Sequence, residues 1–272
     1  MLIVDIAMLP RVDLIRGDES SWLLMQSPDW ITNSIKKNGN WGSNESNLCK
    51  VFTVDEEKPI VIDVGANIGG FAIPVAKSLM DCAGKVYCFE PQRIIFQQLC
   101  ANTFLNRLDN IFTHNVALGE NNGTLNIPEL DFSKSQNCGG FSIDPMIRKE
   151  VAAEFTNVSV GASSVVEMRT LDSCELFEGV AFVKVDIEGT ELEFFKGATQ
   201  TLLHNNYPPI LFEQWENKVW YEAKAEKTKT FLTEMGYRLQ RLNGEILAQH
   251  PKYRKSYNIK RDGNRLTLER AS

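Results

Sequence analysis

Polar residues with a spacing suited to chemistry follow two apolar stretches of the chain. The first stretch, residues 61–64, contains Asp63 and runs into a glycine-containing turn at residues 65–69. The second stretch, residues 86–89, is followed directly by Glu90. A carboxylate that follows the second strand of a βαβ unit can accept hydrogen bonds from both hydroxyls of a ribose. The two stretches therefore predict a site for an adenosine-type cofactor at the carboxyl edge of a parallel sheet.

The glycine spacing distinguishes this turn from that of nicotinamide dinucleotide enzymes. Those enzymes use G-x-G-x-x-G, which brings a pyrophosphate to the start of a helix. Here the order is Gly65-x-Asn67-x-Gly69, so Asn67 stands where a glycine would be required. Gly65 lets the backbone turn sharply and approach a ligand closely. The turn suits a cofactor with a positively charged methionine end. The alternative is a tight strand-to-helix turn without a ligand, which would leave a buried Asp63 without a partner.

A second charged group follows two later strands. Lys184, Asp186 and Glu188 alternate along and just beyond the predicted strand 180–185, and Glu213 ends the strand 209–213. Alternate residues of a strand share one side, and charges buried there are costly unless they are paired or functional. One of the three carboxylates could take a proton from an acceptor hydroxyl, and Lys184 could lower the pKa of that hydroxyl. The carboxylates could instead gather Mg²⁺, and Glu188 could cap the helix that starts near residue 190.

Histidine and cysteine chemistry is disfavoured. His114 lies within a predicted strand next to Asn115, and neighbouring residues point to opposite faces, so packing is favoured over a role as a base. The six cysteines include no C-x-x-C pair, and the three histidines lie apart from them, which argues against zinc.

Predicted strands and helices alternate along the part of the chain that carries these residues. Strands alternating with helices of 10–15 residues indicate βαβ units and a mostly parallel sheet. Right-handed crossovers then give an α/β fold, a doubly wound, Rossmann-like three-layer sandwich. We expect an antiparallel closing strand or hairpin from residues 253–259 and 265–269. The predicted strands are 60–64, 85–90, 110–116, 180–185, 209–213 and 237–242, and the predicted helices are 70–80, 93–106, 190–204 and 222–235.

Domain organisation is simple at this length of 272 residues. Residues 1–50 are expected to form a helical and loop segment that covers the core. Residues 51–272 are expected to form the main domain, with a rim insertion at about 120–170 that holds short strands and a helix near 145–155. These two less regular segments are expected to shape the pocket of the second substrate.

Composition restricts the partners. The formal net charge is −6 and the pI is about 5.3, whereas general nucleic-acid binding needs clustered Lys and Arg. Residues 1–10 are apolar but short and interrupted by Asp5, so neither a signal peptide nor a membrane span is expected. A cytoplasmic location follows by default, and nothing in the sequence indicates the oligomeric state.

The order of motifs between residues 60 and 215 resembles the FkbM-type methyltransferases, which belong to the Rossmann-like class of S-adenosylmethionine enzymes. The most specific parts of the resemblance are Thr170-Leu-Asp172 and Lys184-Val-Asp-Ile-Glu-Gly189. Residues 1–50 and 216–272 lie outside it. The remaining matching pieces are residues 63–71, 89–91, Asn106, 115–118, Gly197-Ala198 and 211–213.

The resemblance implies roles for individual residues. The methionine end of S-adenosylmethionine is assigned to the turn after the first strand, the ribose to the end of the second, and the adenine to the end of the third. Asp186 is placed both in the cofactor site and among the catalytic residues. The cofactor set is Asp63, Gly65, Ala66, Asn67, Gly69, Glu90, Pro91, Asn115, Val116, Ala117 and Asp186. The catalytic set, which is argued from the charged residues at the later strand ends, is Lys184, Asp186, Glu188 and Glu213.

The function that follows from the resemblance is S-adenosylmethionine-dependent O-methylation of a hydroxyl on a sugar, a glycan or another small molecule. A methyltransferase acting on protein or nucleic acid is the first alternative, disfavoured by the acidic pI and by the lack of an Asn-Pro-Pro-Tyr tetrapeptide. A non-catalytic S-adenosylmethionine-binding module is the second, disfavoured by the clustered carboxylates.

Overall fold

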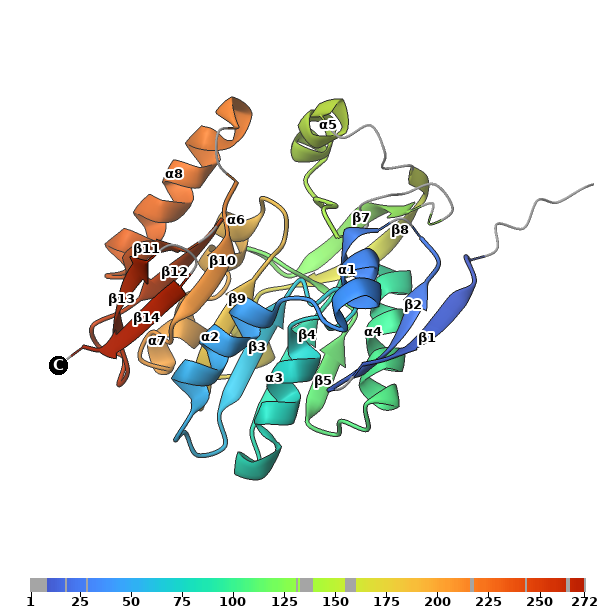
Figure 1. Cartoon of the computed structure of the whole chain (residues 1–272). Coiled ribbons are helices and arrows are strands. Elements are labelled where there is room, and N and C mark those ends of the chain that lie inside the picture. Colours follow the sequence, from blue (N-terminus) through green and yellow to red (C-terminus); the bar gives the residue numbers. More distant parts are fainter. Residues whose placement is uncertain are drawn as a thin grey trace, which may run out of the picture.

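A mixed, mostly parallel sheet forms the centre of the molecule in the computed structural model (Figure 1). The structure describes residues 9–17, 19–27, 29–130, 132, 139–154, 160–215, 218–242, 244–262 and 265–271. The strands of this sheet are β3 (Ile60–Val64), β4 (Lys85–Phe89), β5 (Ile111–His114), β9 (Val180–Val185), β10 (Ile210–Glu213), β11 (Arg238–Leu242) and β12 (Glu245–Gln249). Their order is β11-β12-β10-β9-β3-β4-β5.

Helices cover both faces of this sheet (Figure 1). One face packs on α2 (Ser43–Thr53), α3 (Ala72–Ser78) and α4 (Arg93–Leu105), and the other on α6 (Glu191–Lys196), α7 (Thr199–His204) and α8 (Val219–Glu234). Alternation along β3 explains the two layers, because Val61 enters the first core and Ile62 the second. The predicted three-layer α/β sandwich is confirmed.

The antiparallel strand of the sheet is β12, which the sequence did not predict. It pairs antiparallel with both β10 and β11. Its apolar part is only Ile246–Ala248, a run too short to distinguish from a buried turn until its neighbours are known. The C-terminal segment predicted to close the sheet forms the hairpin alternative instead, a separate pair of β13 (Tyr257–Asp262) and β14 (Arg265–Arg270).

The predicted helix 190–204 is divided into α6 and α7. A Cβ atom on Gly197 would lie 2.0 Å from the carbonyl oxygen of Gly119, so this backbone passes directly against the rim insertion. The break therefore occurs at the point where only glycine allows the contact. Two short 3₁₀ helices, Met80–Cys82 and Asp172–Cys174, complete the connections.

The N-terminal segment contains the expected helices, α1 (Trp30–Asn38) and α2, and also a hairpin that was not predicted. Its strands are β1 (Val12–Arg16) and β2 (Ser21–Met25). Asn102 of α4 and Asn106, which caps the end of α4, fix β2: Asn102 Oδ1 accepts from Leu23 N at 2.7 Å and Asn106 Oδ1 accepts from Ser21 N at 3.0 Å. Contacts so distant in sequence leave no local signal.

The rim insertion lies beside the carboxyl edge of the sheet (Figure 1). It contains β6 (Ala117–Leu118), β7 (Gly123–Leu130), α5 (Pro145–Glu154) and β8 (Val160–Arg169), and its strands form a separate sheet in the order β6-β8-β7. In the described part of the chain, no helix is both long enough and apolar enough to cross a bilayer. Residues 1–8, which make up most of the apolar start, lie outside the described residues.

Candidate active site

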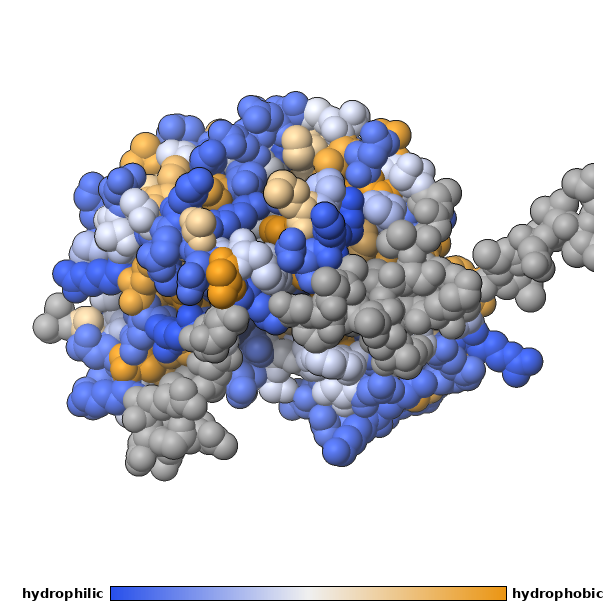
Figure 2. Space-filling view, turned by 90° about the horizontal axis from the view of Figure 1, so that it is seen from above, coloured by the Kyte–Doolittle hydropathy of each residue, from blue (hydrophilic) through white to orange (hydrophobic). Residues whose placement is uncertain are grey.

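A cavity of about 510 Å³ opens at the carboxyl edge of the central sheet. The ends of β3, β4, β9 and β10 contribute to it, together with α5, the start of α8 and the segment that joins α1 to α2. Figure 2 shows this edge from above as a mostly hydrophilic face with small groups of hydrophobic residues among the polar ones. The cavity therefore lies where ligands bind in open parallel sheets.

Asp63 and the turn after it form the floor at β3. Asp63 is 1 % exposed and pairs in register with Lys184 of β9. Its Oδ2 atom has no hydrogen-bond partner. Burial raises the pKa of Asp63 to about 7, although the nearby Lys184 charge lowers it. A buried carboxylate oxygen without a partner, on a residue that lines a cavity, indicates a missing donor.

Gly65 is required because two strand ends meet at this turn. Its φ is +81°, and a Cβ atom there would lie 1.8 Å from the carbonyl oxygen of Asp186. Asn67 also adopts a left-handed conformation, with φ of 50°, and its Oδ1 accepts from the Ile68 N–H at 2.7 Å. Gly65 therefore allows a close approach, as the sequence predicts, but the group that approaches it in the structure is the backbone of Asp186.

Glu90 is fixed by the backbone around it. Its Oε2 accepts from Asn67 N at 3.0 Å and its Oε1 accepts from Gln92 N at 2.8 Å. Burial raises the pKa of Glu90 to about 7, against these two hydrogen bonds, which lower it. Each carboxylate oxygen has a second lone pair, so the group can still accept from a ligand in the cavity it lines.

Asn115 lies behind the cavity rather than in its wall. Its Nδ2 donates to the carbonyl oxygens of Glu90 at 2.8 Å and Pro91 at 3.1 Å. Val116 and Ala117, which follow it, do line the cavity. Asn115 can therefore affect an adenine site only through the loop that it holds. His114 stacks on Phe89 with ring centres 4.9 Å apart and is also outside the cavity wall, in agreement with a packing role.

The predicted charged group is assembled at the ends of β9 and β10. Lys184 Nζ donates to Asp186 Oδ2 at 2.9 Å. Carboxylate oxygens of Asp186, Glu188 and Glu213 lie within 4.8 Å of one another. Burial lowers the pKa of Lys184, but the carboxylates of Asp186, Glu245 and Asp63 outweigh it and hold that pKa above its ordinary value.

Crowding makes two of these carboxylates poor anions. Burial and the neighbouring Asp186 raise the pKa of Glu213 to about 8. Burial and Glu213 raise the pKa of Glu188 well above its ordinary value. Glu188 and Glu213 are therefore suited to exchange protons, and the three carboxylates lie close enough together to hold a cation.

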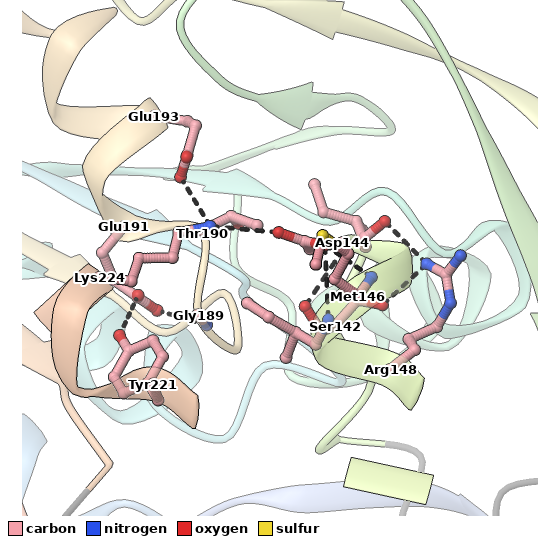
Figure 3. A network of polar contacts seen from close by, with 12 residues as sticks. Ser142, Asp144, Met146, Arg148, Gly189, Thr190, Glu191, Glu193, Tyr221 and Lys224 are labelled. Atoms are coloured by element: carbon pink, nitrogen blue, oxygen red, sulfur yellow. Dashed lines mark hydrogen bonds and ion pairs between the residues drawn. The ribbon is translucent and has the colours of Figure 1, made fainter. Parts of the chain in front are cut away.

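Glu191, not Glu188, is the carboxylate that accepts a backbone N–H just before α6. Its Oε1 accepts from Gly189 N at 2.9 Å, and its Oε2 accepts from the Tyr221 hydroxyl at 2.9 Å (Figure 3). Glu188 has φ of 55°, and its side chain lines the cavity. The helix-capping alternative for Glu188 is not seen, because no side chain of the described residues accepts a capping hydrogen bond at the start of α6.

Several further wall residues were not singled out from the sequence. Glu245 stands directly opposite Glu213 in the pairing of β10 with β12, and it was missed because β12 was missed. Trp215 lines the cavity and also packs against Trp220, with ring centres 5.5 Å apart. The other such residues are Trp30, Trp41, Glu45, Ile143, Val151, Lys218 and Trp220.

We expected the N-terminal segment and the rim insertion to shape the pocket of the second substrate, and both contribute residues to the cavity wall. Trp30, Trp41 and Glu45 come from the N-terminal segment, and Ile143 and Val151 from the rim insertion. Both less regular segments therefore shape the cavity wall.

Known proteins were compared with the chain. The family model described as Methyltransferase FkbM domain matches residues 63–239. The hexuronic acid methyltransferase AglP of Haloferax volcanii is 31% identical over 157 residues, which is 56% of this chain and 55% of that protein. The chain thus matches about half the length of this relative.

Solved structures show only distant similarity. A methyltransferase FkbM from Methylobacillus flagellatus has a TM-score of 0.45 at 19% identity, over 72% of this chain and 44% of that one. TYW2 of M. jannaschii, in complex with AdoMet, has a TM-score of 0.42 at 16% identity, over 88% and 84%. The family assignment depends on the family model, which covers well over half of the chain: this chain belongs to the methyltransferase FkbM family.

Proposed function

We propose that the chain transfers a methyl group from S-adenosylmethionine to a hydroxyl of a sugar, a glycan or another small molecule. The observation that carries the proposal is that one cavity is lined both by Asp63 and Glu90 and by the neighbouring cluster of Asp186, Glu188 and Glu213. The first pair suits a cofactor and the second suits proton transfer from an acceptor. Family membership supports the reaction class.

The residues present fit the cofactor. Asp63 offers a buried oxygen without a partner, which would suit the cofactor's ammonium group. Glu90, held by two backbone N–H groups, would accept from ribose hydroxyls. When bound, S-adenosylmethionine supplies a methyl group already activated on a sulfonium. The protein then needs mainly to align the acceptor and manage one proton.

We assign to the carboxylate cluster the role of accepting the proton that the acceptor hydroxyl loses. Asp186 is engaged by the ammonium of Lys184, so Glu213 and Glu188 remain better placed to exchange a proton. A base works best when its pKa lies near the working pH, and that of Glu213 is raised to about 8. We assign the base role to this pair acting together, because their titrations are linked through short separations.

The acceptor class is supported by the walls around the cluster. Trp215 and Trp220 give aromatic surface beside carboxylates, a combination that suits the apolar face and the hydroxyls of a sugar. The relative AglP is named for its action on hexuronic acid, which points in the same direction. A cytoplasmic location and a small-molecule acceptor complete the proposal.

Labelled methyl transfer tests the function. The chain is incubated with methyl-labelled S-adenosylmethionine and separate panels of neutral sugars, uronic acids, glycans, protein and RNA. Label in the carbohydrate panels supports the proposal, whereas label only in protein or RNA would favour the alternative class. The same assay with EDTA, with and without added Mg²⁺, tests whether the cluster works as a base or through a metal ion. Activity that survives EDTA removes the metal alternative.

A further inference from the structure

Lys224 connects α8 to the residue before α5 and to α6. Its Nζ lies 3.2 Å from Asp144 Oδ2, just before α5, and 3.2 Å from Glu193 Oε2 in α6 (Figure 3). The side chain of Lys224 is only 21% exposed. An ammonium in this position neutralises two carboxylates that would otherwise approach each other without a counter-charge.

The start of α5 depends on Asp144. Its Oδ1 accepts from Met146 N at 2.8 Å, which is the hydrogen bond of a helix cap. Burial raises the pKa of Asp144, but this hydrogen bond and Lys224 outweigh it and hold the pKa below its ordinary value. Arg148, one turn into the helix, donates to the carbonyl oxygens of Ser142 at 3.1 Å and Ile143 at 2.7 Å. The entry into α5 is therefore a compact unit, and Lys224 connects it to α8.

This unit carries an apolar wall over the catalytic turn. Ile147 packs on Gly189, where an added Cβ would lie 2.6 Å from Ile147 Cδ1. Ile143 and Val151 line the cavity on the same side. The turn that presents Glu188 thus lies directly beneath α5, so a movement of α5 would change the space beside the proposed base.

We propose that Lys224 is a positioning residue that holds α5 as the apolar wall of the acceptor site, and so sets affinity for the acceptor rather than for the cofactor. Among the described residues, the ion pairs of Lys224 are with Asp144 and Glu193, whereas the proposed cofactor residues lie in β3 (Asp63) and just after β4 (Glu90). The claim about the acceptor rests on the proposed function, whereas the claim about the position of α5 does not.

Hydrogen exchange tests the position of α5 without any substrate. In Lys224→Met the amides of residues 146–151 should exchange about fivefold faster, because a partly buried ion pair of this kind contributes at most a few-fold to a local equilibrium. Lys224→Arg should keep the wild-type rate. Asp144→Asn keeps an oxygen for the cap but loses the charge, so it should behave like Lys224→Met.

Lys229→Met is the matched control. Lys229 lies on the same helix and pairs with Glu226 at 2.7 Å, three residues away, without joining α8 to another element. Its removal should leave α5 exchange unchanged. Equal exchange in Lys224→Met and wild type, or the same increase in the control, would overturn the proposal.

Kinetics test the acceptor claim. With an acceptor found by label transfer, Lys224→Met should raise the acceptor KM about fivefold, while kcat and the affinity for S-adenosylmethionine stay within about twofold. Lys224→Arg should restore KM. Faster exchange with unchanged KM would overturn the acceptor claim. Failure of wild-type protein to bind S-adenosylmethionine would instead contradict the proposed function, and the exchange result would still stand.

Discussion

Replacing Gly65 by alanine should damage both the fold and the cofactor site. The residue has φ of +81°, and an added Cβ would lie 1.8 Å from the carbonyl oxygen of Asp186. That oxygen belongs to backbone that follows a central strand, so no side-chain rotation can relieve the overlap. The turn between β3 and α3 would have to move away from the end of β9.

The size of the effect follows from two contributions. A left-handed conformation costs an L-residue about 1–2 kcal/mol, and forcing an extra methyl group into a packed site costs about 1–3 kcal/mol. Together they predict a loss of roughly 3 kcal/mol in the free energy of unfolding. For a chain of this size about 2–4 °C in Tm corresponds to each kcal/mol, so Tm should fall by roughly 6–12 °C.

Circular dichroism during heating measures this effect, with Gly123→Ala as the control. Gly123 begins β7, and an added Cβ there would meet no atom within 4 Å. The control should therefore melt within about 2 °C of the wild-type protein. S-adenosylmethionine binding should be lost in Gly65→Ala and retained in Gly123→Ala. If Gly65→Ala melts with the wild-type protein and binds the cofactor normally, the described contact between the two strand ends is wrong.

The remaining predictions concern the carboxylate cluster and the α6 junction. The pKa of Glu213 rises from 4.5 to about 8 on folding, so its contribution to stability is full below pH 4.5 and is lost as pH rises through about 8. Thermal melts from pH 5 to 8.5 should therefore increasingly favour Glu213→Gln over wild type, by about 1 kcal/mol or more; a constant difference would contradict the raised pKa. Glu213→Gln should reduce turnover about 100-fold or more while the Kd for S-adenosylmethionine changes by less than about threefold; normal turnover would remove Glu213 from the proposed base pair. Gly197→Ala should destabilise the chain by about 2 kcal/mol or more in urea unfolding, because its Cβ would lie 2.0 Å from Gly119 O; a neutral result would contradict that close approach.

The parts of the fold that could be predicted are those with a local signal. All six residues of β9 are buried and all but Lys184 are apolar, a pattern typical of a central parallel strand. Similar apolar runs predicted β3 and β4, and these two strands place Asp63 and Glu90 at the carboxyl edge of the sheet. Since strand ends of a parallel sheet meet at that edge, the approach of Asp186 to Glu213 followed from the strand assignments alone.

The rest depends on contacts between residues far apart in the sequence. Lys224 and Asp144 are separated by 80 positions, and neither carries a pattern that names the other. Glu245 escaped notice because β12 offers only three consecutive buried apolar residues after Gly244. Asn115 shows a different difficulty: its place at the strand end was correct, but its amide points to carbonyl oxygens of the neighbouring loop. Side-chain direction after a strand ends does not follow the period of the strand.

Titration calorimetry with S-adenosylmethionine tests the central claim most directly, with NAD⁺ as the competing cofactor and Glu90→Ala as the variant. We expect the wild-type chain to bind S-adenosylmethionine and not NAD⁺. In Glu90→Ala the affinity for S-adenosylmethionine should be about tenfold or more weaker, because hydrogen bonds to a buried charged group contribute about 1.5–3 kcal/mol. Unchanged affinity in the variant would remove Glu90 from the ribose site. Binding of NAD⁺ in place of S-adenosylmethionine would contradict the account as a whole.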